Sequence, residues 1–264
     1  MHDLKQRLLV GGGTVALLIV IILLAARPLF SPLIALVVAA VVAIAMWEYL
    51  QMARLKALMA ILCSIAYVFS VFMSSQNLVW AGLPLLIFVC SLFIFFVSHF
   101  DSVDHALSDV AIKCFGFVYI TVSMSLILNI FSSFEGIWWV VYLLVVTKGA
   151  DSAAFFVGRS LGKRKLAAKL SPAKTVEGAL GGIAVAMLIS LGLSGILYSL
   201  SWSEALWLGA LVGAVGQVGD LAESLIKRDV GVKDSNAIPG LGGVFDMIDS
   251  LLFTAPVVYR FLML

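Results

Sequence analysis

Apolar runs of about 20 residues recur along the chain, and they restrict the fold more than any other feature of the sequence. An α-helix needs about 20 apolar residues to cross the hydrocarbon core of a bilayer, which is roughly 30 Å thick. Strands of a membrane barrel would give shorter segments of alternating polarity, and the sequence contains none. Only helices and closed barrels satisfy every backbone group in lipid, so we predict an all-α integral membrane protein.

Nine of these runs are predicted to be transmembrane helices, which makes the protein polytopic. Lys5 and Arg7 precede the first run and Ala25-Ala26 follows it, a pattern that a secretory signal peptide also shows. The run is long for a signal peptide, so we favour a retained helix. The nine runs lie near residues 8–26, 31–50, 57–73, 78–98, 110–130, 137–157, 179–200, 204–222 and 246–263.

The distribution of charge predicts how these helices are oriented. Only 12% of the residues are charged, whereas roughly 25% is usual in a soluble domain. Cytoplasmic loops of membrane proteins carry an excess of Lys and Arg. With an inside N-terminus, the inner segments hold all of the 17 Lys and Arg residues except Arg27, Lys148 and Arg260. The net charge of +2 gives no reason to expect a nucleic-acid partner, so membrane lipids are the expected surroundings.

Residues 1–135 contain few groups that suggest chemistry. Glu48 lies beside Trp47 and Tyr49 near the end of a predicted helix, where anchoring at the membrane interface is the expected role. The segment 99–109 has three acids and two histidines, and we expect a solvated loop there, with a metal site as the alternative. We therefore expect one integral domain, 1–264, in which 1–135 is mainly scaffold and 136–264 carries the chemistry.

The first candidate site follows the sixth predicted helix. Lys148 and Asp151 are three residues apart and share a helix face, and charges inside a membrane helix are costly enough to indicate function. A basic, glycine-containing segment leads from there to the next helix, whose N-terminal N–H groups favour anions. This predicts a phosphate-binding loop, and the alternative is that the charges only set topology. Its proposed members are Arg159, Ser171, Lys174 and Thr175.

The second candidate site is the stretch 216–250, the most densely charged part of the chain. Asp246 and Asp249 are three apart at the start of the last helix, so they share a face. Mg²⁺ commonly takes one or two carboxylates and completes its shell with substrate phosphates and water, which suits such a face. If the preceding helix continues past the membrane, a second such face carries Asp220, Glu223, Ser224 and Lys227.

A glycine-rich turn, 238–243, joins these two acidic helix ends. Glycine allows close backbone approach, so the N–H groups of Gly242 and Gly243 are candidates for contacting an anion. A tight connection within a solvated charged loop is the plain alternative. The flanking acids favour a ligand-binding site over a plain connection.

Together these residues resemble the phosphatidate cytidylyltransferases (CDP-diacylglycerol synthases). The signature of that family has the form S-x-x-K-R-x4-K-D, a short spacer, and P-G-H-G-G-x-x-D-R-x-D. The resemblance covers roughly residues 145–260 and rests on Ser224, Lys227, Arg228, Lys233, Asp234, Pro239, Gly240, Gly242, Gly243, Asp246 and Asp249, with upstream matches at Asp151, Gly158-Arg159, Ser171-Pro172, Lys174-Thr175, Glu177-Gly178, Gly219-Asp220 and Glu223. Two positions depart from it, because Leu241 and Met247 stand where the family has His and Arg.

The resemblance implies that CTP and phosphatidate react to give CDP-diacylglycerol and pyrophosphate. It implies a Mg²⁺ site, with a second cation expected, whose ligands are Asp220 and Asp246 with Asp249, Glu223 and Asp151. Catalytic roles fall to Asp220, Lys227, Arg228, Asp246 and Asp249, and substrate binding to Arg159, Ser171, Lys174, Thr175, Glu177, Ser224, Lys233, Asp234, Gly242 and Gly243.

The implied location is the inner or plasma membrane of a bacterium, with the active site facing the cytoplasm and a homodimer as one assembly to test. Three alternatives stay open from the sequence. One is a related lipid-phosphate cytidylyltransferase or a lipid kinase. Another is a secondary transporter that uses Asp151, Asp220 and Asp246 as ion sites. The third is an inactive homologue, for which Leu241 and Met247 are the reason.

Overall fold

A computed structural model describes residues 31–100, 103–233, 235 and 243–264 of the chain. The predicted helix 8–26, the site residues Asp234 and Gly242, and Leu241 lie outside this part. The chain forms two compact units. The first contains the described residues up to Ser132 and those within 234–247, and the second contains Ser133–Lys233 and Ile248–Leu264.

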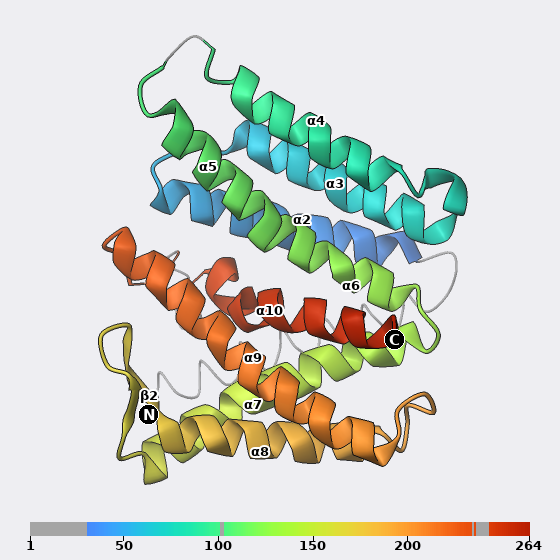
Figure 1. Cartoon of the computed structure of the whole chain (residues 1–264), viewed down its shortest axis with the longest axis vertical. Coiled ribbons are helices and arrows are strands. Elements are labelled where there is room, and N and C mark those ends of the chain that lie inside the picture. The colour runs from blue at the N-terminus through green and yellow to red at the C-terminus, as the bar shows by residue number, and fades with distance from the viewer. Residues whose placement is uncertain (1–30, 101–102, 234, 236–242) are drawn as a thin grey trace. The chain divides into compact units, whose positions relative to one another are not determined.

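The first unit is a bundle of consecutive helices, coloured blue to green in Figure 1. Short connections join neighbouring helices, and α5 runs through the π turn η3 into α6 without a break. The elements are α2 (Ser31–Met52), α3 (Leu58–Gln76), η2 (Leu78–Trp80), α4 (Leu83–Val97), α5 (Ala106–Gly116), η3 (Phe117–Val122) and α6 (Ser123–Phe131).

Aromatic packing around the π turn fixes the end of α2 in this unit. Phe117 is fully buried, and its ring centroid lies 5.4 Å from that of Tyr67 and 5.9 Å from that of Phe95. A Cβ at Gly116 would overlap the ring of Tyr49, so only glycine lets α2 and α5 approach this closely. Tyr49 also donates a hydrogen bond to the carbonyl of Ile112 at 3.2 Å. The segment of α2 that carries Glu48 is thus held by packing on its own unit.

The second unit contains three long helices, a small hairpin and most of the last helix. Its elements are α7 (Gly136–Leu161), β1 (Lys165–Ala167), β2 (Ser171–Thr175), α8 (Val176–Leu193), α9 (Trp202–Asp229) and, from Ile248 on, α10 (Val244–Leu262). Within this unit the end of α7, the hairpin, the start of α8 and the end of α9 lie at the same end of the helices (Figure 1). That end carries the basic segment and the acidic end of α9 that the sequence singled out.

Small residues bring α7, α8 and α9 close together. A Cβ on Gly178 of α8 would lie 2.6 Å from the carbonyl oxygen of Ala154 in α7. A Cβ on Gly209 of α9 would lie 2.7 Å from the Cβ of Ser190 in α8. Close backbone approach through small residues is a common way to pack helices in lipid, where hydrophobic burial gives little driving force between them.

Seven helices among the described residues are long and apolar enough to cross a membrane. They correspond to the second to eighth predicted crossings, so the polytopic helical fold is confirmed while the count of nine stays a prediction. The remaining helix, α10, has 19 residues but includes Asp246, Asp249 and Arg260, and it is not among the seven. The candidate spans are Ser31–Met52, Leu58–Gln76, Leu78–Val97, Ala106–Phe131, Gly136–Leu161, Val176–Leu193 and Trp202–Asp229.

Two predicted helix ends are wrong for reasons that the structure explains. The seventh predicted helix was expected to reach residue 200, but α8 ends at Leu193. The backbone N–H groups of Tyr198 and Ser199 instead donate to the carboxylate of Glu135 at 3.1 and 3.2 Å. The following helix starts with a capping box made by Ser201 and Glu204, and it continues to Asp229 rather than ending near 222.

Candidate functional site

The basic segment after α7 folds into a two-stranded antiparallel hairpin rather than a loop. Lys165 pairs with Thr175 in the register of the two strands. The carboxylate of Glu177 accepts hydrogen bonds from the N–H groups of Lys163 and Arg164, the shortest at 2.9 and 3.1 Å. Glu177, which the sequence assigned to substrate binding, therefore ties the hairpin to the start of α8 in this structure.

Thr175 is the N-cap of α8 and sits in a space that only glycines leave open. Its Oγ1 accepts a hydrogen bond from the N–H of Gly178 at 3.1 Å. A Cβ on Gly158 would lie 2.9 Å from that oxygen, and one on Gly162 would lie 2.6 Å from it. The cap explains why the hairpin leads directly into a helix N-terminus, the kind of position where backbone dipoles favour anions.

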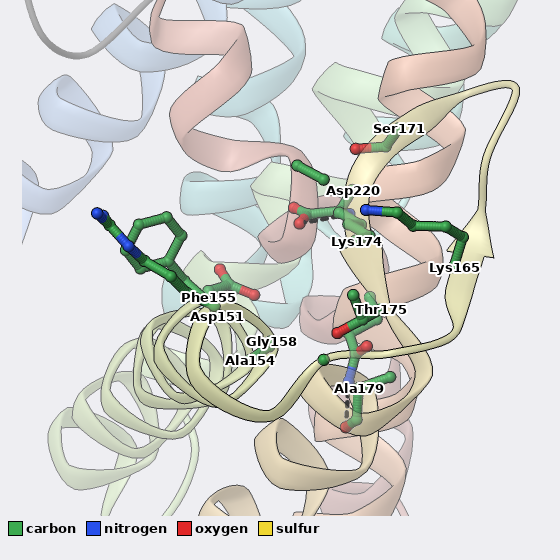
Figure 2. Close-up of a pocket in the computed structure, with 14 residues that line it drawn as sticks. Asp151, Ala154, Phe155, Gly158, Lys165, Ser171, Lys174, Thr175, Ala179 and Asp220 are labelled. Atoms are coloured by element: carbon green, nitrogen blue, oxygen red, sulfur yellow. Dashed lines mark hydrogen bonds and ion pairs between the residues drawn. The ribbon is translucent and has the colours of Figure 1, made fainter.

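A pocket of about 520 Å³ opens between this hairpin, α7 and α9 (Figure 2). Six residues predicted for the site line it, namely Asp151, Arg159, Ser171, Lys174, Thr175 and Asp220. Lys165, Phe155 and Gln217 also line it, although the sequence analysis did not assign them to the site. Gln217 donates from Nε2 to the carbonyl of Ala179 at 2.9 Å. A polar amide inside the apolar part of α9 was the signal that could have identified it.

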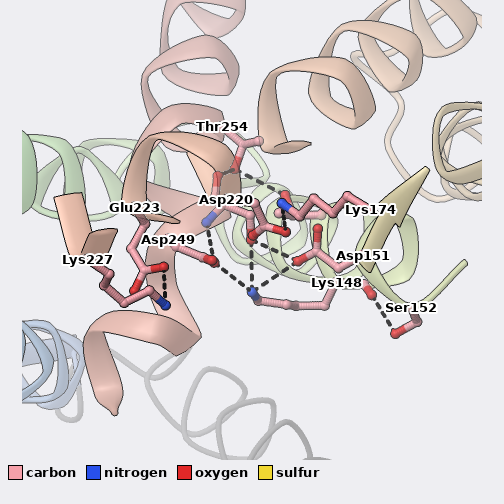
Figure 3. Close-up of polar contacts among 11 residues, drawn as sticks. Lys148, Asp151, Ser152, Lys174, Asp220, Glu223, Lys227, Asp249 and Thr254 are labelled. Carbon is pink, nitrogen blue, oxygen red and sulfur yellow. Dashed lines mark hydrogen bonds and ion pairs between the residues drawn. The ribbon is translucent and has the colours of Figure 1, made fainter. Parts of the chain in front are cut away.

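Next to the pocket, Lys148 is surrounded by oxygen atoms (Figure 3). Its Nζ lies 3.2 Å from Asp151 Oδ2, 2.8 Å from Ser250 Oγ and 3.9 Å from Asp249 Oδ1. Ser250 Oγ donates in turn to Asp151 Oδ2 at 2.8 Å. The predicted pairing of Lys148 with Asp151 is confirmed, and α10 adds a second carboxylate and a hydroxyl that the spacing of α7 alone could not indicate.

Asp220 connects the pocket to these residues. Its Oδ2 lies 2.6 Å from Nζ of Lys174 on β2 (Figure 3), and its carboxyl group is within hydrogen-bonding reach of that of Asp249. We call Lys148, Asp151, Lys174, Asp220 and Asp249 the charged cluster. If all are ionised, three acids and two lysines leave it with one negative charge, so it has room for another cation.

The charged cluster lies deeper along the helices than the sequence suggested. Lys148 and Asp151 are near the middle of α7, which runs from Gly136 to Leu161. Asp220 lies more than two turns before the end of α9 at Asp229. Asp151 and Asp220 were expected near helix ends, but they lie well inside long helices and line the pocket, whereas Asp249 lies in the second turn of α10, as expected.

The rest of the predicted face on α9 is confirmed as helical but contacts other groups. Glu223 is buried, and its Oε2 pairs with Nζ of Lys227 at 2.5 Å (Figure 3). Arg228 donates from Nε to the carbonyl of Leu170 in the hairpin at 3.3 Å. Ser224 is half-buried on α9, and Lys233 is exposed beyond its end. Arg228 thus contacts the hairpin, whereas the roles of Ser224 and Lys233 stay predictions.

Asp246 and Gly243 belong to the first unit, at the start of α10. Asp246 Oδ2 accepts hydrogen bonds from the N–H of Gly243 at 2.7 Å and from the N–H of Ser235 at 3.1 Å. The Gly243 N–H, which was expected to contact an anion, is therefore directed at Asp246 here. Met247 is half-buried one residue further along the helix.

The donor set of the charged cluster fits a hard divalent cation. Asp220 and Asp249 present adjacent carboxyl groups. Two ionised carboxylates so close together repel one another, and a bound cation would relieve that repulsion. Among the described residues, no three acidic, His or Cys side chains converge closely enough to hold a metal ion by themselves. Mg²⁺ commonly uses one or two carboxylates and completes its shell with phosphates and water, so this arrangement is compatible with it.

Comparison with known proteins gives a consistent result. The model of the cytidylyltransferase family matches residues 5–264. The chain is 34% identical over 175 residues to the phosphatidate cytidylyltransferase of Chlamydia muridarum, covering 60% of this chain and 56% of that protein. It is 43% identical over 131 residues to the phosphatidate cytidylyltransferase of Bacillus subtilis, covering 49% of each.

A further similarity is to an uncharacterized protein of Escherichia coli, YnbB, with 47% identity over 124 residues, which is 47% of this chain and 42% of that protein. The matched part of the chain spans about half the length of these curated relatives.

Proposed function

Because the chain belongs to the cytidylyltransferase family, we propose that it transfers a cytidylyl group from CTP to phosphatidate, giving CDP-diacylglycerol and pyrophosphate. The family that the motifs indicated is the family to which the chain belongs. Two of the relatives are named phosphatidate cytidylyltransferases, and the family match over residues 5–264 includes the two candidate sites.

The observation that carries the proposal is the contact between the basic hairpin and the acidic end of α9. Lys174 of the hairpin pairs with Asp220, and both line the pocket together with Arg159 and Lys165. A nucleoside triphosphate is a polyanion that binds with Mg²⁺, so its site needs cationic side chains beside carboxylates. The pocket supplies both, and its volume of about 520 Å³ is within the range of small-molecule sites.

The charged cluster suggests how the reaction is assisted. An oxygen of the phosphatidate phosphate attacks the α-phosphorus of CTP, a new P–O bond forms, and the bond from the α-phosphorus to the bridging oxygen breaks to release pyrophosphate. Bound Mg²⁺ would neutralise the negative charge on the triphosphate oxygens as pyrophosphate leaves. Asp220 and Asp249 would hold it, Asp151 would support them as an outer partner, and Asp246 and Glu223 would be further ligands. A second cation belongs to the same proposal.

The cationic side chains orient the two substrates. Arg159, Lys165 and Lys174 face the pocket, where they bind phosphate oxygens, and Ser171 and Thr175 offer hydroxyl groups beside them. Lys227, Arg228 and Lys233 neutralise the leaving pyrophosphate. The attacking lipid phosphate is already anionic, so the chain needs no strong general base, and we assign none.

We also propose that the site faces the cytoplasm from the inner or plasma membrane of a bacterium. The basic hairpin and the ends of α7 and α9 lie at one end of the second unit, as an inside-facing loop requires (Figure 1). Phosphatidate stays in the leaflet while CTP is soluble, so the reaction belongs at this interface. A homodimer is a further proposal, tested by the mass of the protein in detergent.

One observation favours a different class of protein. Lys148 and Asp151 lie near the middle of α7, where a secondary transporter would hold its coupling ion. The basic hairpin above the pocket favours the enzyme, because a transported small ion gives no reason for so many phosphate-binding cations. A lipid kinase or a transferase for another lipid phosphate would use the same kind of site with a different substrate.

Product formation separates these possibilities. The purified full chain is mixed with Mg²⁺, phosphatidate and each of CTP, ATP, GTP and UTP, and released pyrophosphate and CDP-diacylglycerol are measured. We expect both products with CTP and Mg²⁺ and neither without the metal. No release with CTP, beside an active relative as control, contradicts the proposal, and ADP formation from ATP identifies a kinase instead.

A further inference from the structure

Glu48 is a buried carboxylate near the end of α2, and its hydrogen-bond donors come from a segment far away in the sequence. Its residue is only 1% exposed. Oε1 accepts a hydrogen bond from the N–H of Val244 at 3.1 Å, and Oε2 accepts from the N–H of Phe245 at 2.8 Å and from Ser235 Oγ at 3.0 Å. A buried carboxylate in a membrane helix is costly unless such donors surround it. The position of Glu48 in the sequence suggested an anchor at the membrane interface. Its burial and its donors instead indicate an internal hydrogen-bond acceptor.

These donors include N–H groups at the start of α10. The first N–H groups of a helix have no partner within the helix, and the helix dipole favours negative charge beside them. Two carboxylates accept hydrogen bonds at the start of α10. Asp246 accepts from the N–H of Gly243, and Glu48 accepts from the N–H groups of Val244 and Phe245. Glu48 differs from an ordinary cap because it comes from another helix.

The packing around Gly243 leaves little freedom in this arrangement. A Cβ at Gly243 would overlap both Ser235 Oγ and the carboxylate of Glu48. Ser235 is held from two sides, because its Oγ donates to Glu48 and its N–H donates to Asp246. The start of α10 is thus fixed in the first unit by one acid from α2 and one from α10 itself.

The position of this helix start determines where two proposed metal ligands lie. Asp246 and Asp249 are one turn apart on α10, and Asp249 is a member of the charged cluster. A small rotation or shift of the helix start moves both carboxylates together. We propose that Glu48 is a positioning residue for the reaction, acting through the start of α10 on Asp246 and Asp249; this inference rests on the proposed function.

Glu48→Gln tests the inference, and Glu135→Gln is its matched control. Gln keeps the length of the side chain but replaces one of the two carboxylate oxygens by an NH₂ group, which cannot accept a hydrogen bond from an N–H of α10. Glu135 also accepts two backbone N–H groups, those of Tyr198 and Ser199, but it touches no proposed ligand. Supporting residues behind metal ligands typically contribute about 10- to 100-fold in metal affinity or activity.

We expect Glu48→Gln to lower kcat about tenfold or more and to raise the Mg²⁺ concentration for half-maximal rate about tenfold. The KM for phosphatidate should stay within about twofold, because the lipid-binding side chains are untouched. Without substrates, the Mg²⁺-dependent rise in melting temperature should also require more Mg²⁺ than in the wild-type chain. Glu135→Gln should match the wild-type chain in all of these measurements.

A wild-type Mg²⁺ requirement in a folded Glu48→Gln protein, in both the rate and the melting measurements, overturns the inference. If that variant does not fold, Ser235→Ala provides the second test, because it removes one of the donors to Glu48. It should raise the Mg²⁺ requirement as well, by a smaller factor. An unchanged Mg²⁺ requirement in Ser235→Ala also overturns the inference. Absence of product from the wild-type chain would instead refute the proposed function, so the two failures are distinguishable.

Discussion

Two groups of buried and half-buried carboxylates in this protein are satisfied in different ways. In the second unit, Asp151 and Asp220 are paired with the ammonium groups of Lys148 and Lys174. In the first unit, Glu48 and Asp246 accept hydrogen bonds mainly from backbone N–H groups. An ammonium on a flexible side chain can move aside for a metal ion or a phosphate, whereas a backbone N–H at a helix start cannot move without moving the helix.

The comparison separates two kinds of acid in a membrane enzyme. The charged cluster consists of exchangeable pairs around a pocket, so its acids are suited to bind ligands. The start of α10 consists of fixed hydrogen bonds, so its acids are suited to hold geometry. Asp246 is the critical case, because it is a proposed metal ligand whose carboxylate also orders the turn at Gly243.

Asp220→Asn and Asp246→Asn should have the largest effects and should differ in stability. Loss of a metal-binding carboxylate removes about 4 kcal/mol of transition-state stabilisation, so we expect Asp220→Asn to release pyrophosphate about 1,000-fold more slowly. Its metal-free melting temperature should fall less than that of Asp246→Asn, because loss of the ion pair with Lys174 is partly offset by removal of a like charge beside Asp249. Asp246→Asn should also lose most activity but should cost about 1–2 kcal/mol of stability, since it weakens the helix cap.

Activity and melting temperature of both purified proteins check this prediction. Equal destabilisation of the two variants without metal would break the comparison, because both acids would then act as fixed structural acceptors. Retained activity in Asp246→Asn would remove that residue from the proposed ligands and leave it as a cap.

Lys148→Met is the next largest expected effect. The change leaves Asp151, Asp220 and Asp249 with a single lysine, and because this pair is only half-buried its loss should cost less than the about 3–5 kcal/mol of a fully buried pair. Because Mg²⁺ can replace the lost positive charge, we expect Mg²⁺ to stabilise this variant more than it stabilises the wild-type chain. Thermal melts with and without Mg²⁺ measure the difference. The same gain from Mg²⁺ in both proteins would mean that Lys148 and the metal do not share these carboxylates.

Much of this architecture could be predicted from local patterns. Hydrophobic runs gave the seven candidate spans that the structure describes, and helical spacing gave the pairing of Lys148 with Asp151. Helical spacing also predicted that Glu223 and Lys227 meet if α9 continues past residue 222, because side chains three and four apart lie on one helix face. These features depend only on residues near one another in the sequence.

The features that could not be predicted all depend on contacts between distant segments. The hydrogen bond from the N–H of Phe245 to the carboxylate of Glu48 joins residues 197 positions apart. Nothing in the sequence around Glu48 shows where its donors come from. The hairpin was read as a loop because its strands are only three and five residues long. Glu177 was assigned to substrate because its use as an acceptor for Lys163 and Arg164 appears only once the hairpin has folded.

Leu241→His combined with Met247→Arg should change the rate by a smaller factor. These substitutions restore the residues of the family pattern on either side of Gly243, and each adds a polar donor near the start of α10. If those donors contact the triphosphate, we expect kcat/KM for CTP to rise about five- to thirtyfold, since one added charge-assisted hydrogen bond is worth about 1–2 kcal/mol. Steady-state kinetics with CTP measure it. An unchanged value would show that this chain uses other groups there.

The smallest effect concerns Glu135, a third carboxylate bound by backbone N–H groups but located in a loop. Partial desolvation raises its pKa, yet hydrogen bonds from Ser199 and from the N–H of Tyr198 outweigh it and hold the pKa below the ordinary value of 4.5. A lowered pKa in the folded state stabilises the protein above pH 4.5, and this contribution disappears as the pH falls through the folded-state pKa. The melting temperature of Glu135→Gln should therefore lie slightly below that of the wild-type chain at pH 7 and converge with it near pH 3. A constant difference in melting temperature across that pH range would show that packing, rather than the charge of Glu135, stabilises the loop. Stabilisation of a carboxylate by backbone N–H groups would then be confined to helix starts such as that of α10.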